Sequence, residues 1–211
     1  MELILILKHA IIGFIMAFLG LLSPGLLTST TLNTAIDRGS KEAVKFALGA
    51  VIPIFIQAHI ALLGAEYFKN HPEIIKKFSG IAVYVFLGLA VFFLYQFFTR
   101  HQTAIGMTKF NIRNSFLYGL FISLINPLAI PFYFTYTSLL ELKGIIILHE
   151  PYITVFVISA MLGAFTILYF YAKHAHLILG KIQLIARNFK LVLALIMFIL
   201  AISAFFTKKN I

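Results

Sequence analysis

The sequence predicts an all-α membrane protein with six transmembrane helices. Hydrophobic residues make up 61% of the chain and charged residues only 11%, whereas a soluble domain carries about 25% charged residues. An α-helix needs roughly 20 apolar residues to cross the hydrocarbon. Six stretches approach that length, and they leave no room for a second, soluble domain within residues 1–211: 3–22, 43–64, 78–98, 116–140, 153–172 and 191–206.

The first apolar stretch ends at a helix break. Ser23-Pro24-Gly25 follows it, and residues 26–34 are rich in serine and threonine. Hydroxyl side chains can pair backbone groups at membrane depth, so we expect this segment to form the second part of a broken helix. Glu2 stands where a signal peptide would carry a basic residue, so we expect the stretch to stay in the mature protein.

The fourth apolar stretch carries the matching break, at Asn126-Pro127. Pro24 and Pro127 are 103 positions apart in a chain of 211 residues. Proline removes a backbone donor and clashes with the preceding helical turn. In lipid, the carbonyl groups that it frees need partners in protein or in water. Breaks at matching places in two halves favour a transporter built from two repeats, with its site between them.

The remaining stretches complete two three-helix units, repeat one at about residues 1–108 and repeat two at about residues 109–211. Because each unit has an odd number of spans, we expect the second unit to be inverted relative to the first. Stretch two contains Ala-Leu-Gly-Ala around Gly49, and stretch five contains Met-Leu-Gly-Ala around Gly163. This similarity is weak, but it agrees with a diverged repeat.

Basic residues set the predicted orientation. The loops after stretches one, three and five carry ten Lys and Arg residues, and the opposite side carries seven. The positive-inside rule therefore places both termini outside. The formal net charge of +10 is explained by topology, so no nucleic-acid partner is expected. The chain has no cysteine, which excludes disulfides, thiolate metal sites and thiol catalysis.

In its motifs the chain resembles the lysine/threonine exporter family, the LysE/RhtB-type translocators. The motifs read Pro24-Gly25-Leu26, Arg38-Gly39-Ser40-Lys41 and Gly49, followed by Phe116, Gly119 and Asn126-Pro127-Leu128. Leu26 and Leu128 replace a proline and a lysine of the family pattern. Pro53 and Ile54 stand near the place where many members carry an acidic residue. The resemblance implies a multi-pass exporter of amino acids in the bacterial cytoplasmic membrane.

Substrate binding is predicted at the two breaks. A half-helix that starts at Pro24-Gly25 offers free amide donors and a positive dipole end to a carboxylate, and Gly25 allows close approach. Carbonyls at a half-helix C-terminus and the faces of Tyr133 or Tyr136 can meet an ammonium group. The predicted substrate-binding residues are Ser23, Pro24, Gly25, Thr28, Asn126, Pro127 and Tyr133. Two alternatives stay open: Pro24 only kinks its helix, and Asn126 only caps the freed backbone.

Gln57 and His59 are candidates for a proton relay. Polar residues inside membrane spans are often functional, and histidine titrates near neutral pH. The alternative for His59 is a hydrogen bond across a helix interface, or a place near the outer headgroups. Lys8 and His9 interrupt the first span, where a lysine is expected to snorkel. His174 and His176 point to different faces of a helix, so no metal site is predicted.

We predict a secondary exporter of amino acids or similar small metabolites, which works by alternating access and is driven by the proton gradient. None of the seven acidic residues lies near the middle of a predicted span, which disfavours an intramembrane aspartyl protease or a divalent-cation exporter. The chain has no Gly-x-x-x-x-Gly-Lys loop for ATP, and we expect neither enzyme activity nor a cofactor.

Several alternatives stay open. Efflux can be simply facilitated, without a coupled proton. A non-transport membrane subunit or scaffold is the alternative function, in which case the paired breaks would lack a purpose. A Ser23–His59 catalytic pair is a weaker alternative, because it lacks a nucleophile motif. A homodimer is compatible with a chain of this size, and nothing in the sequence identifies its interface.

Overall fold

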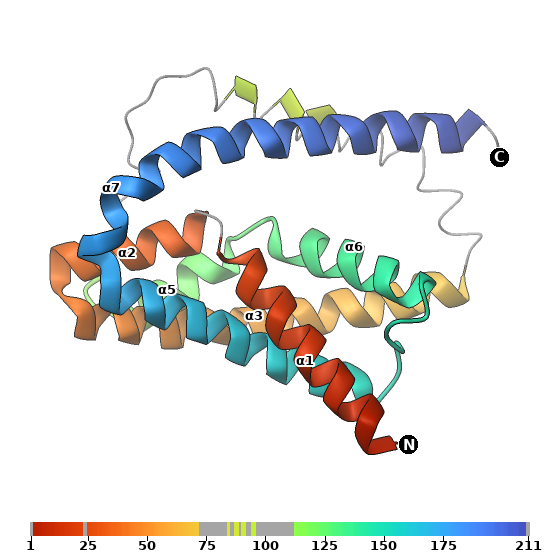
Figure 1. Cartoon of the computed structure of the whole chain (residues 1–211), viewed down its shortest axis with the longest axis horizontal. Coiled ribbons are helices and arrows are strands. Elements are labelled where there is room, and N and C mark those ends of the chain that lie inside the picture. Colours follow the sequence, from red (N-terminus) through yellow and green to blue (C-terminus); the bar gives the residue numbers. More distant parts are fainter. Residues whose placement is uncertain are drawn as a thin grey trace.

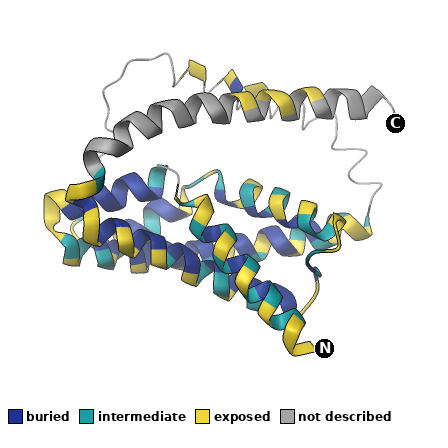
Figure 2. Cartoon of the chain, in the orientation of Figure 1, coloured by how far each residue is buried: buried dark blue, intermediate teal, exposed yellow. Residues whose placement is uncertain are grey.

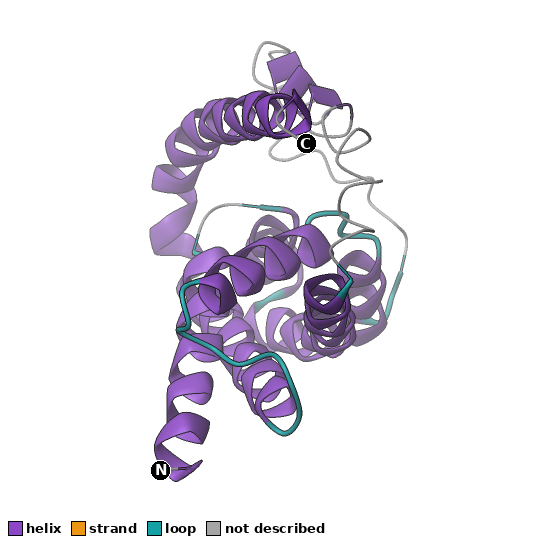
Figure 3. Ribbon diagram, turned by 90° about the vertical axis from the view of Figure 1, so that its right-hand side faces the viewer, coloured by secondary structure: helices purple, strands orange, loops and turns teal. Residues whose placement is uncertain are grey.

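The structure is a bundle of α-helices. The computed structural model describes residues 2–22, 25–71, 84, 87, 88, 90, 91, 94, 95 and 112–209, with side chains beyond 178 described only at 195, 198, 199 and 202. Figures 1 and 3 show these residues as helices and loops. The helices are α1 (Glu2–Gly20), α2 (Leu26–Arg38), α3 (Ser40–Asn70), α5 (Ser115–Leu124), α6 (Ala129–Leu142) and α7 (Tyr152–Lys209).

Four of the predicted spans are found among the described residues. α1, α3 and the first part of α7 (Tyr152–Ile178) are each long and apolar enough to cross a membrane. α5 and α6 qualify together as one span that is bent by 59° at its break. The membrane prediction is therefore confirmed for stretches 3–22, 43–64, 116–140 and 153–172. Stretch 78–98 and most side chains of stretch 191–206 lie outside the described residues.

Stretches five and six lie on two helices that meet at a kink within α7. α7 continues through both stretches, with non-helical dihedral angles at His174 (φ −113°, ψ 23°) marking a kink between two helices. The segment between the stretches contains one glycine and no proline. Its leucine, lysine, alanine and glutamine residues favour a helix, so the sequence holds no strong signal that would end α7 there.

Two of the helix starts have clear local causes. The Asn114 side chain caps α5, since its Oδ1 accepts the amide N–H of Phe116 at 2.9 Å and that of Leu117 at 3.3 Å. Gly39 joins α2 to α3 with φ of 89°, a left-handed conformation that favours glycine. The chain therefore turns at Gly39, and α3 starts directly after it.

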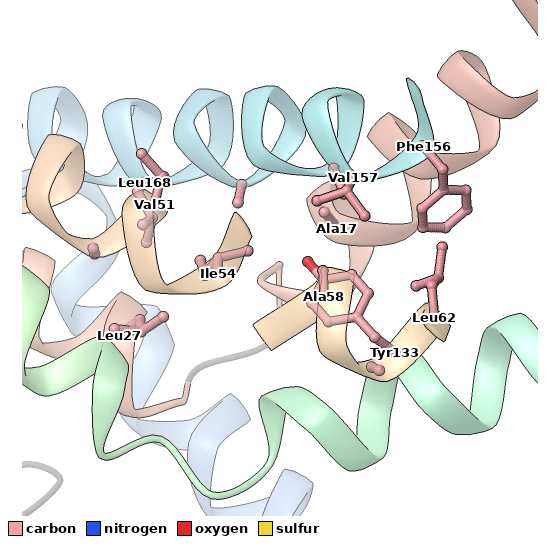
Figure 4. Packing of buried hydrophobic residues seen from close by; sticks show 14 of the residues in the cluster. Ala17, Leu27, Val51, Ile54, Ala58, Leu62, Tyr133, Phe156, Val157 and Leu168 are labelled. Carbon is pink, nitrogen blue, oxygen red and sulfur yellow. The ribbon is translucent and has the colours of Figure 1, made fainter. Parts of the chain in front are cut away.

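α3 is the central helix of the bundle. It contacts α2, α5, α6 and α7, and α1 packs against α7. Figure 2 shows the buried faces of these helices turned toward one another. Figure 4 shows the core between them, where Leu27 of α2, Ile54 of α3 and Leu168 of α7 meet. Large apolar side chains such as Leu3 and Ile11 of α1 are exposed, as expected for a surface in contact with lipid.

Glycines allow two pairs of helices to cross at backbone contact. A Cβ atom at Gly49 of α3 would collide with the carbonyl of Phe116 on α5. A Cβ atom at Gly163 of α7 would collide in the same way with the carbonyl of Phe14 on α1. Gly119 and Gly13 are equally tight against the partner helix at these two crossings. Small residues are what lets membrane helices approach this closely.

The glycine crossings predict a position-specific loss of stability. Gly49→Ala or Gly119→Ala forces a methyl group into a backbone carbonyl, which we expect to cost about 1–3 kcal/mol. Gly64→Ala is the matched control, because its nearest neighbours are ring atoms of Phe134 at 3.8 Å or more. Melting temperatures from fluorescence-detected size exclusion should fall for the first two variants only. Three similar melting temperatures would contradict the close crossing.

Candidate functional site

The first break lies between α1 and α2. α1 ends at Gly20 and α2 begins at Leu26, while the predicted site residues Ser23 and Pro24 lie outside the described residues. The hydroxyl of Tyr171 on α7 donates a hydrogen bond to the carbonyl oxygen of Leu22 at 2.7 Å. A carbonyl that the end of α1 leaves without a helical partner is thus paired inside the protein.

Thr28 closes the first turn of α2. The amide N–H of Gly25 donates to Thr28 Oγ1 at 2.7 Å, and the Thr28 hydroxyl lies 3.2 Å from the Gly25 carbonyl. Thr28 is completely buried. This predicted site residue therefore fixes the backbone at Gly25. The start of a helix also carries the positive end of its dipole.

The second break lies between α5 and α6. Asn126 is half-buried, and its Oδ1 accepts the amide N–H of Leu128 at 3.3 Å. The capping role considered for Asn126 is therefore present in the structure. Pro127 is exposed. Gln57 reaches this break from α3, and its Nε2 donates to the carbonyls of Ser123 at 3.1 Å and Leu124 at 3.4 Å.

At both breaks, a side chain from the other half of the chain donates a hydrogen bond to the backbone at the end of the broken helix. Gln57 follows Gly49 by eight residues on α3, and Tyr171 follows Gly163 by eight residues on α7. Each side chain donates to the backbone at the end of a broken helix in the other half of the chain. The accepting residues match as well, because Leu22 and Leu124 each lie eight positions after the phenylalanine whose carbonyl touches the glycine.

Three buried polar atoms near these breaks have no hydrogen-bond partner among the described residues. They are Oγ of Ser29 in the first turns of α2, Oε1 of Gln57 and Oγ of Ser123 at the end of α5. The neighbouring hydroxyls of Thr30 and Thr31 differ, since they bond to the carbonyls of Leu26 and Leu27. Buried polar atoms are normally paired, so these three are candidates for contact with a polar ligand.

Tyr133 reaches the centre of the core from α6. Its side chain is 4% exposed, and its ring stands edge-on to the neighbouring Phe132. Figure 4 shows the hydroxyl pointing inward, past Ala58 of α3 toward Ala17 of α1. In the part of the chain that the structure describes, this hydroxyl has no hydrogen-bond partner. The predicted site residue therefore presents an aromatic face and a polar atom to the middle of the bundle.

The two candidate relay residues diverge on α3. Gln57 faces the end of α5, as described above. His59 faces the loop before α7, where its Nε2 lies 3.7 Å from Oε1 of Glu150 and its side chain is 29% exposed. The structure therefore does not join Gln57 and His59 into one chain. The interface role considered for His59 agrees with this contact, which links the two halves.

The histidines of α7 give no metal centre. His174 bonds through Nδ1 to the carbonyl of Phe170 at 3.1 Å and stacks on the same residue's ring. Within the described residues, no group of three or more histidine, aspartate or glutamate side chains could hold a metal ion.

Comparison with known proteins identifies one family. The model of the family described as LysE type translocator matches residues 18–207 of the chain. Comparison with curated proteins and with solved structures gives no match. The matched range includes both breaks, the α3–α5 glycine crossing and the two donors Gln57 and Tyr171, whereas Gly13 and Phe14 of the α1–α7 crossing precede it.

Removing either donor should destabilise the bundle to a similar extent. Gln57→Leu leaves the carbonyls of Ser123 and Leu124 unpaired, and Tyr171→Phe leaves that of Leu22 unpaired. Each loss is expected to cost about 1–3 kcal/mol. Tyr169→Phe is the matched control, because Tyr169 is 43% exposed. Thermal unfolding in lipid nanodiscs should separate the first two variants from the control, and equal stability of the two Tyr→Phe variants would contradict the capping role.

Proposed function

This chain belongs to the LysE type translocator family, and on that premise we propose that it is a secondary transporter that exports amino acids or similar small zwitterions across the bacterial cytoplasmic membrane. The observation that carries the proposal is the pair of helix breaks, each held by a buried donor from the other half of the chain. A scaffold would have no need for two such breaks, whereas a transporter uses them as binding sites.

The proposed mechanism is alternating access between two inverted repeats, and the same contacts support it. The first helix of each half packs on the middle helix of the other half, with α1 on α7 and α5 on α3. The matched eight-residue spacings support a pseudo-two-fold relation between residues 1–108 and 109–211. In such an arrangement one half rocks against the other around a fixed site, which opens that site to each side of the membrane in turn.

The substrate groups are assigned by the polarity of the broken helices. The start of α2, with Pro24, Gly25 and Thr28, receives the carboxylate, because helix N-termini present free amides and positive potential. The end of α5 receives the ammonium group, because its carbonyls carry the negative end of the dipole. Ser23, Asn126, Pro127 and the ring of Tyr133 complete the proposed site. α2 and α5 are in contact, which suits a ligand as small as an amino acid.

Gln57 contributes a further acceptor for the ammonium group. Its Nε2 is engaged at the end of α5, while its Oε1 is buried and has no partner among the described residues. An amide oxygen accepts hydrogen bonds but carries no charge. Many members of the family that this chain resembles carry an acidic residue just after the glycines of the second span, where this chain has Pro53 and Ile54, and Gln57 lies one helical turn further on. An uncharged amide oxygen is expected to bind the ammonium group more weakly than a carboxylate would, and weak binding suits a substrate that must be released.

The proton gradient is the proposed driving force. Gln57 and His59 are the relay candidates from the sequence, and of the two only His59 has a carboxylate, that of Glu150, within 4 Å among the described residues. Protonated His59 would form an ion pair with Glu150 of the other half. Binding and release of the proton would then strengthen and weaken the contact between the two halves. The proposal places both termini outside, and it holds for a monomer as well as for a homodimer.

Efflux of amino acids from cells that overproduce the protein tests the proposed function. Cells loaded with a panel of radiolabelled amino acids should lose one class faster than cells without the protein. A protonophore should stop this loss if the proton gradient drives it. Efflux that survives the protonophore would contradict proton coupling but leave transport in place. No difference for any amino acid would contradict the proposed substrate class.

Asn126→Ala and Gly25→Leu should abolish efflux while the folded protein remains in the membrane. Gly25 has φ of −128° and ψ of −167°, an extended conformation that any residue adopts, so Gly25→Leu acts by blocking the approach of the substrate. Asn114→Ala is the matched control for Asn126, because Asn114 caps α5 away from both breaks. It should lose about 1 kcal/mol of stability and keep its efflux. Normal efflux in the two site variants would contradict the site.

A further inference from the structure

A histidine outside the proposed substrate site holds the two halves together. His9 of α1 is only 1% exposed, although it and Lys8 interrupt an apolar span. Its Nδ1 lies 2.7 Å from the carbonyl oxygen of Leu5, one helical turn earlier. Its Nε2 accepts the amide N–H of Ile147, at 2.8 Å, from the loop between α6 and α7.

These two bonds fix the protonation state of the ring. A carbonyl oxygen only accepts hydrogen bonds, so Nδ1 must carry a hydrogen to donate to Leu5. The amide of Ile147 only donates, so Nε2 must present its lone pair. His9 is therefore neutral in this structure, and both ring nitrogens are used.

We propose that His9 is a proton-binding site whose occupancy releases the 143–151 loop from α1. A proton from water adds to the lone pair of Nε2, and the ring becomes an imidazolium with N–H groups at both nitrogens. The new N–H faces the N–H of Ile147, so two donors meet and their hydrogen bond is lost. Because the site is almost completely buried, water does not replace the lost acceptor unless the loop moves away.

The groups around His9 are few and mixed in charge. Tyr152 of α7 stacks on the ring with 4.8 Å between centroids, and the ring of His149 in the loop makes an edge-on contact with Tyr152 at 5.2 Å between centroids. Lys8 is the adjacent residue on α1 itself. The carboxylate of Glu150 is turned toward His59 of α3 and the amide of Thr154. Within the described part of the chain no carboxylate contacts His9, so the aromatic face of Tyr152 is the partner that the imidazolium would have.

The position of the bond gives proton binding a consequence for the whole bundle. The loop follows α6 and leads to α7, beside the N-terminal part of α1 (Figure 1). Its Ile146 and Leu148 are buried in the core on either side of the bonded amide. The bond thus joins repeat one to repeat two at the end of the bundle where Lys69 of α3 also pairs with Glu141 of α6.

His9 lies before the residues that the family model matches, which begin at residue 18. The purpose that we assign to the loop release, opening one end of the transport path, rests on the proposed function. The release itself does not depend on any substrate. It can therefore be measured separately from transport, and a failure of one proposal is distinguishable from a failure of the other.

Hydrogen–deuterium exchange of the full chain in lipid nanodiscs tests the proposal. Peptides that cover residues 144–150 should lose protection by roughly tenfold, the effect of one lost hydrogen bond, as the pH falls through the range in which histidine titrates. The rates are first corrected for the intrinsic pH dependence of amide exchange. His9→Gln keeps an amide that can bond to both backbone groups but cannot titrate, so its protection should stay high at every pH.

Two further variants make each outcome decisive. His9→Met cannot bond or titrate, and its loop should be poorly protected at every pH, which covers the case in which His9→Gln does not fold. His149→Gln removes a neighbouring exposed imidazole from the same loop and should keep the pH dependence of the unmodified protein. The proposal is overturned if the unmodified loop shows no pH dependence, if either His9 variant retains it, or if His149→Gln abolishes it.

Discussion

The constraint on which this structure depends is the pairing of backbone carbonyls at helix breaks. Water is absent from the hydrocarbon, so a helix that ends inside the membrane must find donors within the protein. Tyr171 supplies one donor at the end of α1, and Gln57 supplies another at the end of α5. Each donor comes from the opposite half of the chain, so the carbonyls at each break are paired only when the two halves are packed together.

The glycine crossings explain how these donors reach their targets. Gly49 and Gly163 bring α3 against α5 and α7 against α1 at backbone contact. A side chain eight residues further along α3 or α7 then lies about 12 Å along the helix axis, beside the end of the partner helix. The same combination of close helix packing and carbonyl capping is therefore present at both crossings. The buried polar atoms without a partner among the described residues, on Ser29, Gln57 and Ser123, lie near the two helix breaks.

The sequence predicts the features that arise from local chemistry. Hydropathy locates four described spans. The polar segment after Gly25 is confirmed as a buried helix, α2. The roles of single side chains were less predictable, because they depend on residues far apart in the chain. Gln57 was identified as polar and functional, yet its partner is 66 positions away. Tyr171 was missed, although extending the glycine similarity by eight residues would have paired it with Gln57.

In the proposed transport cycle, the two halves rock against each other around the breaks. The chain has no cysteine, so spin labels attach only where cysteines are introduced. One pair, at Asn70 and Leu142, reports on the end of the bundle near the Lys69–Glu141 contact. A second pair, at Lys41 and Arg113, reports on the opposite end of α3, where Arg38 bonds to the Ile112 carbonyl at 3.0 Å. Electron-spin distance measurements in nanodiscs, with and without an exported amino acid, should show one distance lengthening while the other shortens. Two distances that stay unchanged, or that lengthen together, would contradict the account.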